Sequence, residues 1–272
     1  AQAFYDQDRG GKNLVVSAAG YWSAGSLLST LLSMYLIGKV DLKTHITYLQ
    51  VFTYIASVLV IIARKETLIP SNRNEQVVKS ILLDLKKFNF DWKLNFGLIF
   101  GMFLEFAIGD WSTIFAKENG GISATLAPLP FLFFTMCMII GRVSINQLRK
   151  RFRINLLVSI GGALAGTSFL VGIWFINQFN LIGLIITFSF AGIGTSFIGP
   201  SFLNLANTRI NLPSSIVIGQ IGAVNIMLAW VLKQIIAFVA QVAGLQVALT
   251  IPALMAISVG LFTRVFKPIP AK

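Results

Sequence analysis

The sequence predicts an all-α membrane protein, a polytopic bundle of about eight transmembrane helices. Of its 272 residues, 56% are hydrophobic and only 12% are charged. Soluble domains average about 25% charged residues, so this chain has too little polar surface to face water and is expected to lie in a lipid bilayer. Its apolar stretches approach the roughly 20 residues that cross the hydrocarbon core. None of them has the short alternating pattern of a membrane β-barrel strand.

Eight apolar stretches are candidate spans. They cover residues 14–37, 45–63, 94–116, 125–145, 154–176, 181–205, 214–239 and 245–265.

The polar segment 64–93 divides these spans into two and six. Residues 75–88 within it place apolar side chains at helical spacing, which favours either a short helix on the cytoplasmic membrane surface or a solvated linker. We predict the last two helices of an N-terminal bundle over residues 1–63, an inter-bundle loop over 64–93 and a C-terminal six-helix bundle over 94–272. A twelve-helix protein without its first four helices would have this arrangement, so we expect the chain to lack an N-terminal portion.

The Lys and Arg residues predict the orientation. An even number of spans puts both termini on one side, and that side receives nearly all cations; the other keeps Lys39, Lys43 and Lys117, while Lys233 lies within the seventh span. Cytoplasmic loops carry the excess of Lys and Arg, so both ends are predicted in the cytoplasm, beneath the plasma (inner) membrane. A net charge of +12 distributed in this way indicates topology and not a nucleic-acid partner.

Several classes of enzyme are excluded by what the chain lacks. A single Cys and a single His, Cys137 and His45, leave no material for a metal cluster, and a Ser-His-Asp triad is implausible. No Gly-x-x-x-x-Gly-Lys loop is present to bind ATP. We therefore predict no catalytic residues, no cofactor and no metal.

Short motifs in four of the spans give the chain a recognisable likeness. In order along the chain they are Tyr21-Trp22-Ser23-Ala24-Gly25, Glu105 followed by Asp110-Trp111-Ser112, Gly141-Arg142 with Asn146 and Arg151, and Gly192-x-Gly194 with Gly199-Pro200. With these the chain resembles the major facilitator superfamily, specifically its MosC-like branch, in which the seventh helix carries a glutamate and then Asp-Trp-Ser. The Glu105 and Asp-Trp-Ser cluster is the most specific of them.

The resemblance implies two six-helix bundles around a central cavity and transport by alternating access. The chain would hold the fifth to twelfth helices, and Gly141, Arg142, Asn146 and Arg151 would form the cytoplasmic gating loop after the eighth. Asn146 stands where that loop usually has aspartate. We expect a secondary carrier of a small solute, with the proton as candidate coupling ion; the alternative is a non-transporting receptor or scaffold on a carrier fold. The 272 residues alone are not expected to transport.

Glu105 is the first candidate for chemistry because it lies near the middle of its span. A charged carboxylate there costs at least a few kcal/mol unless it faces water, is paired or is protonated. Glu105 is therefore predicted either to face the cavity, where it binds a proton or a substrate donor, or to hold two helices together through hydrogen bonds.

Asp110 lies about 140° around the helix from Glu105, so the two acids are not expected to form a dyad. Asp110 is predicted to act either as an outer gate and substrate contact or as a link between the outer helix ends. Lys233 either extends outward to the interface or pairs with one of the two acids.

Four further polar or aromatic residues inside the spans are predicted to line the cavity: Trp22, Asn204, Gln220 and Asn225. Similar residues also serve as interhelical hydrogen-bonding groups. The small-residue pairs Gly97 with Gly101 and Gly162 with Gly166 predict close helix packing.

Overall fold

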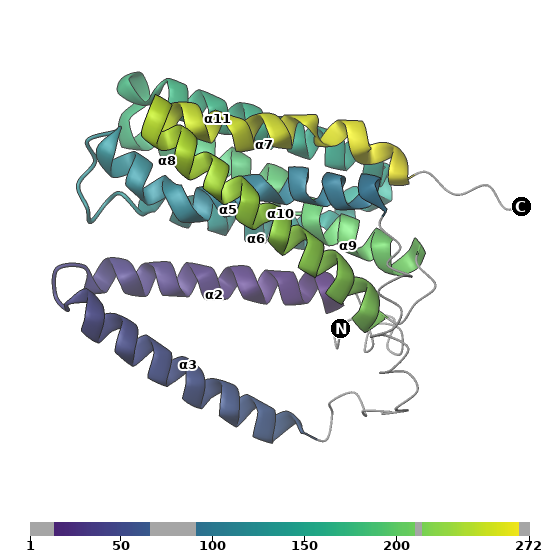
Figure 1. The fold of residues 1–272 in the computed structure, drawn as a ribbon, viewed down its shortest axis with the longest axis horizontal. Helices are drawn as coiled ribbons and strands as arrows, with labels where there is room; N and C mark the ends of the chain where they lie inside the picture. The colour runs from purple at the N-terminus through teal and green to yellow at the C-terminus, as the bar shows by residue number, and fades with distance from the viewer. Residues whose placement is uncertain (1–13, 66–90, 210–213, 267–272) are drawn as a thin grey trace, which may run out of the picture.

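The computed structural model describes residues 14–65, 91–209 and 214–266, and its regular elements there are all helices (Figure 1). They are α2 (Leu14–Leu36), α3 (Leu42–Arg64), α5 (Trp92–Glu118), α6 (Leu129–Arg151), α7 (Ile154–Trp174), α8 (Ile176–Thr195), α9 (Ile198–Arg209), α10 (Ser214–Ala243), α11 (Leu245–Ser258) and the 3₁₀ helix η2 (Val259–Phe266). The predicted all-α class is confirmed. The predicted surface helix at 75–88 lies outside the described residues.

Six helical segments among the described residues are long and apolar enough to cross a membrane. They are Leu42–Ala63, Trp92–Glu118, Ile154–Trp174, Asn180–Arg209, Val217–Ala243 and Leu245–Arg264. The shorter apolar segment Leu129–Ile145 of α6 and the helix α2 occupy the two remaining predicted positions. The chain is a multi-pass helical membrane protein.

The span predicted over residues 181–205 is interrupted. Its helix ends at Thr195, and a new helix, α9, begins at Ile198. Pro200 explains the break, because proline has no N–H to donate to the carbonyl four residues earlier, at Ser196, and its ring clashes with that carbonyl. Gly199-Pro200, part of the family resemblance, thus also interrupts the predicted span.

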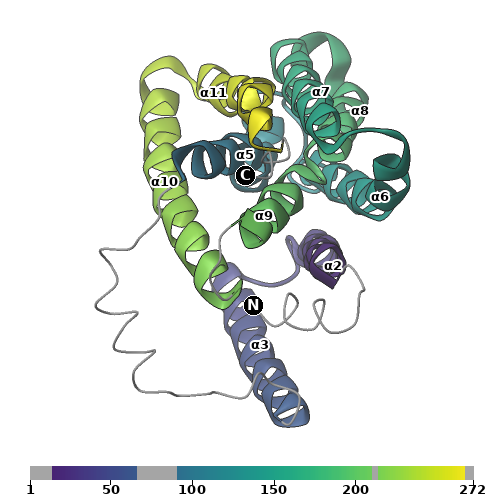
Figure 2. The ribbon, with the colours of Figure 1, turned by 90° about the vertical axis from the view of Figure 1, so that its right-hand side faces the viewer.

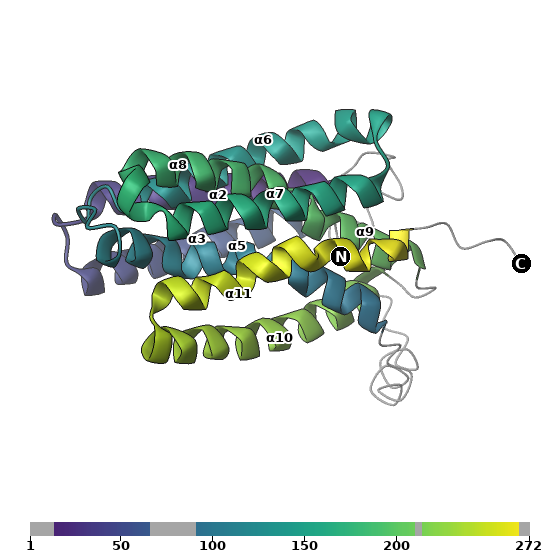
Figure 3. The same ribbon diagram turned by 90° about the horizontal axis from the view of Figure 1, so that it is seen from above.

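The six-helix part packs closely at glycines. A Cβ at Gly162 would lie 2.2 Å from Val259 Cγ1 and 2.4 Å from the Ala256 carbonyl oxygen, and one at Gly166 would lie 2.3 Å from the Ala253 carbonyl oxygen. The predicted close packing at this pair is therefore confirmed, with α11 and η2 as the partners. Figure 3 shows α7 lying between α8 and α11.

The helix α3 stands apart from this core. It diverges from α2 after the turn that joins them (Figures 1 and 2), and none of residues 42–63 is buried. α2, in contrast, packs along α6. A predominantly apolar and uncovered helix suits lipid or another apolar helix. The predicted division into two helices, a loop and six helices stays a prediction.

Most of the described cations lie at one end of the bundle, whereas Lys39, Lys43 and Lys117 lie at the other. The end that holds the C-terminal ends of α3, α6 and α9, with Lys65, Arg151 and Arg209, is opposite the end that holds the α2–α3 and α5–α6 turns (Figure 1). Arg209 Nη1 lies 3.7 Å from Asp91 Oδ2 and joins the end of α9 to the start of α5 there.

Gly162→Ala is expected to destabilise the bundle by about 1–3 kcal/mol, because the added methyl group meets backbone and side-chain atoms of α11 and η2 that must move. The matched control is Gly222→Ala on α10, where a Cβ has nothing within 4 Å. Thermal unfolding in detergent should show a lower midpoint for the first variant and an unchanged or higher one for the second. Equal midpoints for both variants would contradict this packing.

Candidate functional site

A buried ion pair between α5 and α6 is the centre of the site. Glu105 and Arg142 are 7% and 4% exposed, and Arg142 Nη2 lies 3.4 Å from each carboxylate oxygen of Glu105. A carboxylate and a guanidinium carry a large desolvation cost in an apolar interior unless they are paired and further hydrogen-bonded. Pairing is one of the three conditions that the sequence set for Glu105, and here it is met.

Arg142 was predicted in a cytoplasmic loop, and this prediction is wrong in its placement. The helix α6 continues six residues beyond the predicted end at 145, to Arg151, so Arg142 is part of a helix and faces the interior. Its companions are on the same helix: Gly141 is buried, Arg151 is exposed at the last turn, and Asn146 is helical, with a side chain outside the described set. The gating role of these four residues stays a prediction.

Arg142 also contacts two other elements. Its Nε donates to the Ser196 carbonyl oxygen at 2.9 Å, and its Nη1 donates to Ser23 Oγ on α2. The Ser196 carbonyl is the one that Pro200 leaves without its intrahelical donor. Gly141 allows the close approach, since a Cβ there would lie 2.2 Å from Ser196 Oγ. One side chain thus joins α2, α5, α6 and the α8–α9 break.

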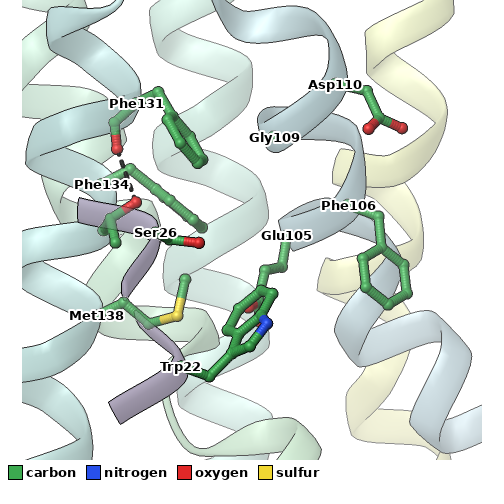
Figure 4. A pocket seen from close by; sticks show the side chains of 10 residues that line it. Trp22, Ser26, Glu105, Phe106, Gly109, Asp110, Phe131, Phe134 and Met138 are labelled. Atoms are coloured by element: carbon green, nitrogen blue, oxygen red, sulfur yellow. Dashed lines mark hydrogen bonds between the residues drawn. The ribbon is translucent and has the colours of Figure 1, made fainter. Parts of the chain in front are cut away.

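A pocket of about 250 Å³ lies beside the ion pair, between α2, α5 and α6 (Figure 4). Its lining residues are Trp22 and Ser26 of α2, Glu105, Phe106, Gly109 and Asp110 of α5, and Phe131, Phe134, Thr135 and Met138 of α6. The Trp22 ring centroid lies 6.0 Å from Arg142 Cζ, at the outer limit of a cation–π contact. The pocket therefore combines a largely apolar wall with two carboxylates, Glu105 and Asp110.

Asp110 has a partner of its own. Its Oδ2 lies 2.7 Å from Lys233 Nζ of α10, so of the alternatives for Lys233 the structure has the ion pair with Asp110. The two side chains are 41% and 42% exposed, and such accessible pairs contribute about 0–1 kcal/mol. Glu105 and Asp110 have separate partners and form no dyad, as expected.

The remaining predicted cavity residues separate into two groups. Asn225 is 8% exposed, donates to Asn95 Oδ1 at 3.2 Å and lines a second pocket of about 410 Å³ between α5, α9 and α10. Asn204 and Gln220 are half-buried and line neither of these two pockets.

Sequence reasoning missed Asn95 and Ser196 as parts of the site. Pro200, four residues after Ser196, carried the signal for a free carbonyl. Asn95 had no comparable signal, because one asparagine at the start of a span is unremarkable in sequence. No three His, Cys, Asp or Glu side chains come together as metal ligands within residues 14–65, 91–209 and 214–266.

A distant similarity to a known protein agrees with the polytopic membrane fold. No model of a protein family matches the chain. The chain is similar to an uncharacterised MFS-type transporter of Yersinia pestis, with 27% identity over 179 residues, which cover 64% of this chain and 45% of that protein. The chain thus matches less than half of that relative's length. The helical spans define a polytopic membrane protein, and its distant similarity is to a protein of the transporter class.

A double-mutant cycle should measure the coupling between Glu105 and Arg142. Each of Glu105→Gln and Arg142→Gln leaves a buried charge uncompensated, so the double variant should be more stable than the sum of the single effects by about 1–3 kcal/mol. The control cycle uses Asp110→Asn and Lys233→Gln, an exposed pair whose coupling should stay below about 1 kcal/mol. Chemical unfolding in detergent provides the measurement. Additive effects in the first cycle would show that Glu105 and Arg142 do not interact in the folded protein.

Proposed function

We propose that this chain is part of a secondary transporter of the major facilitator superfamily, in its MosC-like branch, that moves a small solute by alternating access. The observation that carries the proposal is the buried Glu105–Arg142 pair beside a pocket between α2, α5 and α6. Ionisable residues within spans are rare and mark substrate or ion pathways. The distant similarity to an MFS-type transporter supports the same proposal.

The division into bundles belongs to this proposal. Residues 1–63 would be the last two helices of the first bundle, 64–93 the inter-bundle loop and 94–272 the second bundle. The pocket then lies where the two bundles meet, since Trp22 and Ser26 come from the first and Glu105 from the second. An interface between bundles that rock against each other is the site at which a carrier binds its substrate.

Arg142 offers a means to couple binding to movement. Its guanidinium contacts Ser23 on the first helix pair and Glu105 and Ser196 in the six-helix part. A proton or a substrate donor that binds a Glu105 carboxylate oxygen removes or shares the negative charge that holds Arg142. The contact with Ser23 then changes in strength, and a ligand that changes one of two alternative packings shifts the population between them.

Glu105→Gln is expected to lower substrate-driven uptake by the complete natural protein at least tenfold, or to remove its dependence on pH, because an amide cannot bind and release the proton. Purified protein in liposomes with an internal pH-sensitive dye and a panel of small solutes provides the measurement, normalised to folded protein. The matched control is Glu118→Gln, at the exposed end of α5. Normal, pH-dependent uptake by the Glu105 variant would remove this residue from the cycle. No uptake of any solute by the unaltered protein would favour the receptor or scaffold alternative.

We also propose that the basic end of the bundle faces the cytoplasm of a plasma (inner) membrane. Cysteines placed one at a time in a Cys137→Ala background should report this in intact cells. Lys65→Cys and Arg151→Cys should resist a membrane-impermeant maleimide, whereas Ser123→Cys, at the opposite end, should react. Labelling of either of the first two variants without lysis would contradict the proposed orientation.

A further inference from the structure

A second pocket lies next to the first and has a different character. It measures about 410 Å³ and lies between α5, α9 and α10. Its walls are mostly apolar and include Met102, Leu203, Ile226 and Trp230, while Phe106 lines both pockets. Ligand sites of about 300–1,000 Å³ typically combine such walls with a few fixed polar groups. The size suits a molecule of roughly one or two rings.

The fixed polar group of this pocket is Asn225. Its Nδ2 donates to Asn95 Oδ1 at 3.2 Å and to the Ile221 carbonyl oxygen at 3.0 Å. Asn95 Nδ2 donates in turn to the Asp91 carbonyl oxygen at 3.0 Å. Because all the partners of Nδ2 are acceptors, these bonds fix the orientation of both amides and turn Asn225 Oδ1 away from them.

Asn225 Oδ1 has no hydrogen-bond partner within the described part of the chain, although its residue is more than nine-tenths buried. A buried acceptor without a donor is costly, and in native proteins such an atom calls for an explanation. The oxygen is covered in this conformation, so a ligand donor reaches it only after a neighbouring side chain moves.

The charge at the pocket is already neutralised. Among the described residues of the lining, Lys233 is the one ionisable residue, and its Nζ lies 2.7 Å from Asp110 Oδ2. No unpaired charge is therefore left in the lining to recognise a ligand carboxylate or ammonium group.

We propose that this second pocket binds an uncharged amphiphilic molecule, with an aromatic or hydrocarbon body among Met102, Phe106 and Trp230 and a hydroxyl or N–H that donates to Asn225 Oδ1. This rests on the proposed function, since it names the class of substrate that the carrier would move. A lipid acyl chain fits the apolar wall but has no donor, and it would leave the acceptor unsatisfied.

The test compares two probes of nearly equal shape, 2-naphthol and 2-methylnaphthalene, of which only the first carries a donor. Binding to the full chain in lipid nanodiscs is measured by calorimetry, with empty nanodiscs subtracted to remove partition into lipid. The unaltered chain should bind 2-naphthol about three- to tenfold more tightly, the range that one net hydrogen bond provides.

Two variants and one control make the test specific. Asn225→Leu should bind both probes about equally, because the donor loses its acceptor while the apolar walls remain. Ala229→Phe should weaken both probes at least tenfold, since it fills the pocket and leaves Asn225 in place. Met227→Phe, which adds similar bulk at an exposed position of α10 outside the lining, should change neither affinity.

Equal binding of the two probes to the unaltered chain would overturn the proposal and indicate a lipid-filled or water-filled cavity. An undiminished preference for 2-naphthol in Asn225→Leu would overturn it as well. These results can be distinguished from those of the transport assay. If 2-naphthol is preferred and the preference requires Asn225, but the complete protein transports nothing, the proposed binding pocket stands and the proposed carrier function is wrong. Transport without the preference would remove only the pocket assignment.

Discussion

A guanidinium inside an apolar bundle needs acceptors for its N–H donors, and this requirement organises the structure around Arg142. Glu105 supplies the compensating charge and Ser23 supplies a hydroxyl. Ser196 supplies a backbone carbonyl, which is free to accept because Pro200 has no N–H to donate to it. Gly141 brings the two helices close enough for these contacts. Pro200 and Gly141, residue types that disfavour a regular helix, thus allow the buried guanidinium of Arg142 to reach its hydrogen-bond acceptors.

The helix α5 distributes its polar residues among different neighbours. Glu105 meets α6, Asp110 meets Lys233 of α10, and Asn95 meets Asn225 of α10. Phe106 lines the pockets on both sides of this helix. The two ion pairs also differ in their desolvation cost, because Glu105–Arg142 is almost fully removed from solvent and Asp110–Lys233 is about two-fifths exposed. A change of protonation at Glu105 would therefore disturb the packing far more than one at Asp110.

Much of the fold was predictable because a bilayer admits few solutions. Backbone N–H and C=O groups in hydrocarbon must form their hydrogen bonds within a helix, so an apolar stretch of sufficient length already predicts a transmembrane helix. Hydropathy failed at two details, the break at Ser196 and the continuation of α6 to Arg151. Both depend on hydrogen bonds, which a sum over side-chain hydrophobicity does not contain.

The sequence by itself determined the helical class, the approximate spans, the separation of cations toward alternate connections and the importance of Glu105, because the cost of a charge in a span depends on composition and position alone. Only the tertiary structure decided that Arg142, 37 residues away, is its partner, that Lys233 belongs to Asp110, and that Asn225 is left with an unpaired oxygen. An arginine near the end of an apolar run has the same sequence signature whether it lies at the membrane surface or in the core. The difference lies in which neighbouring helices bring acceptors within about 3 Å, and that depends on how all the helices pack together.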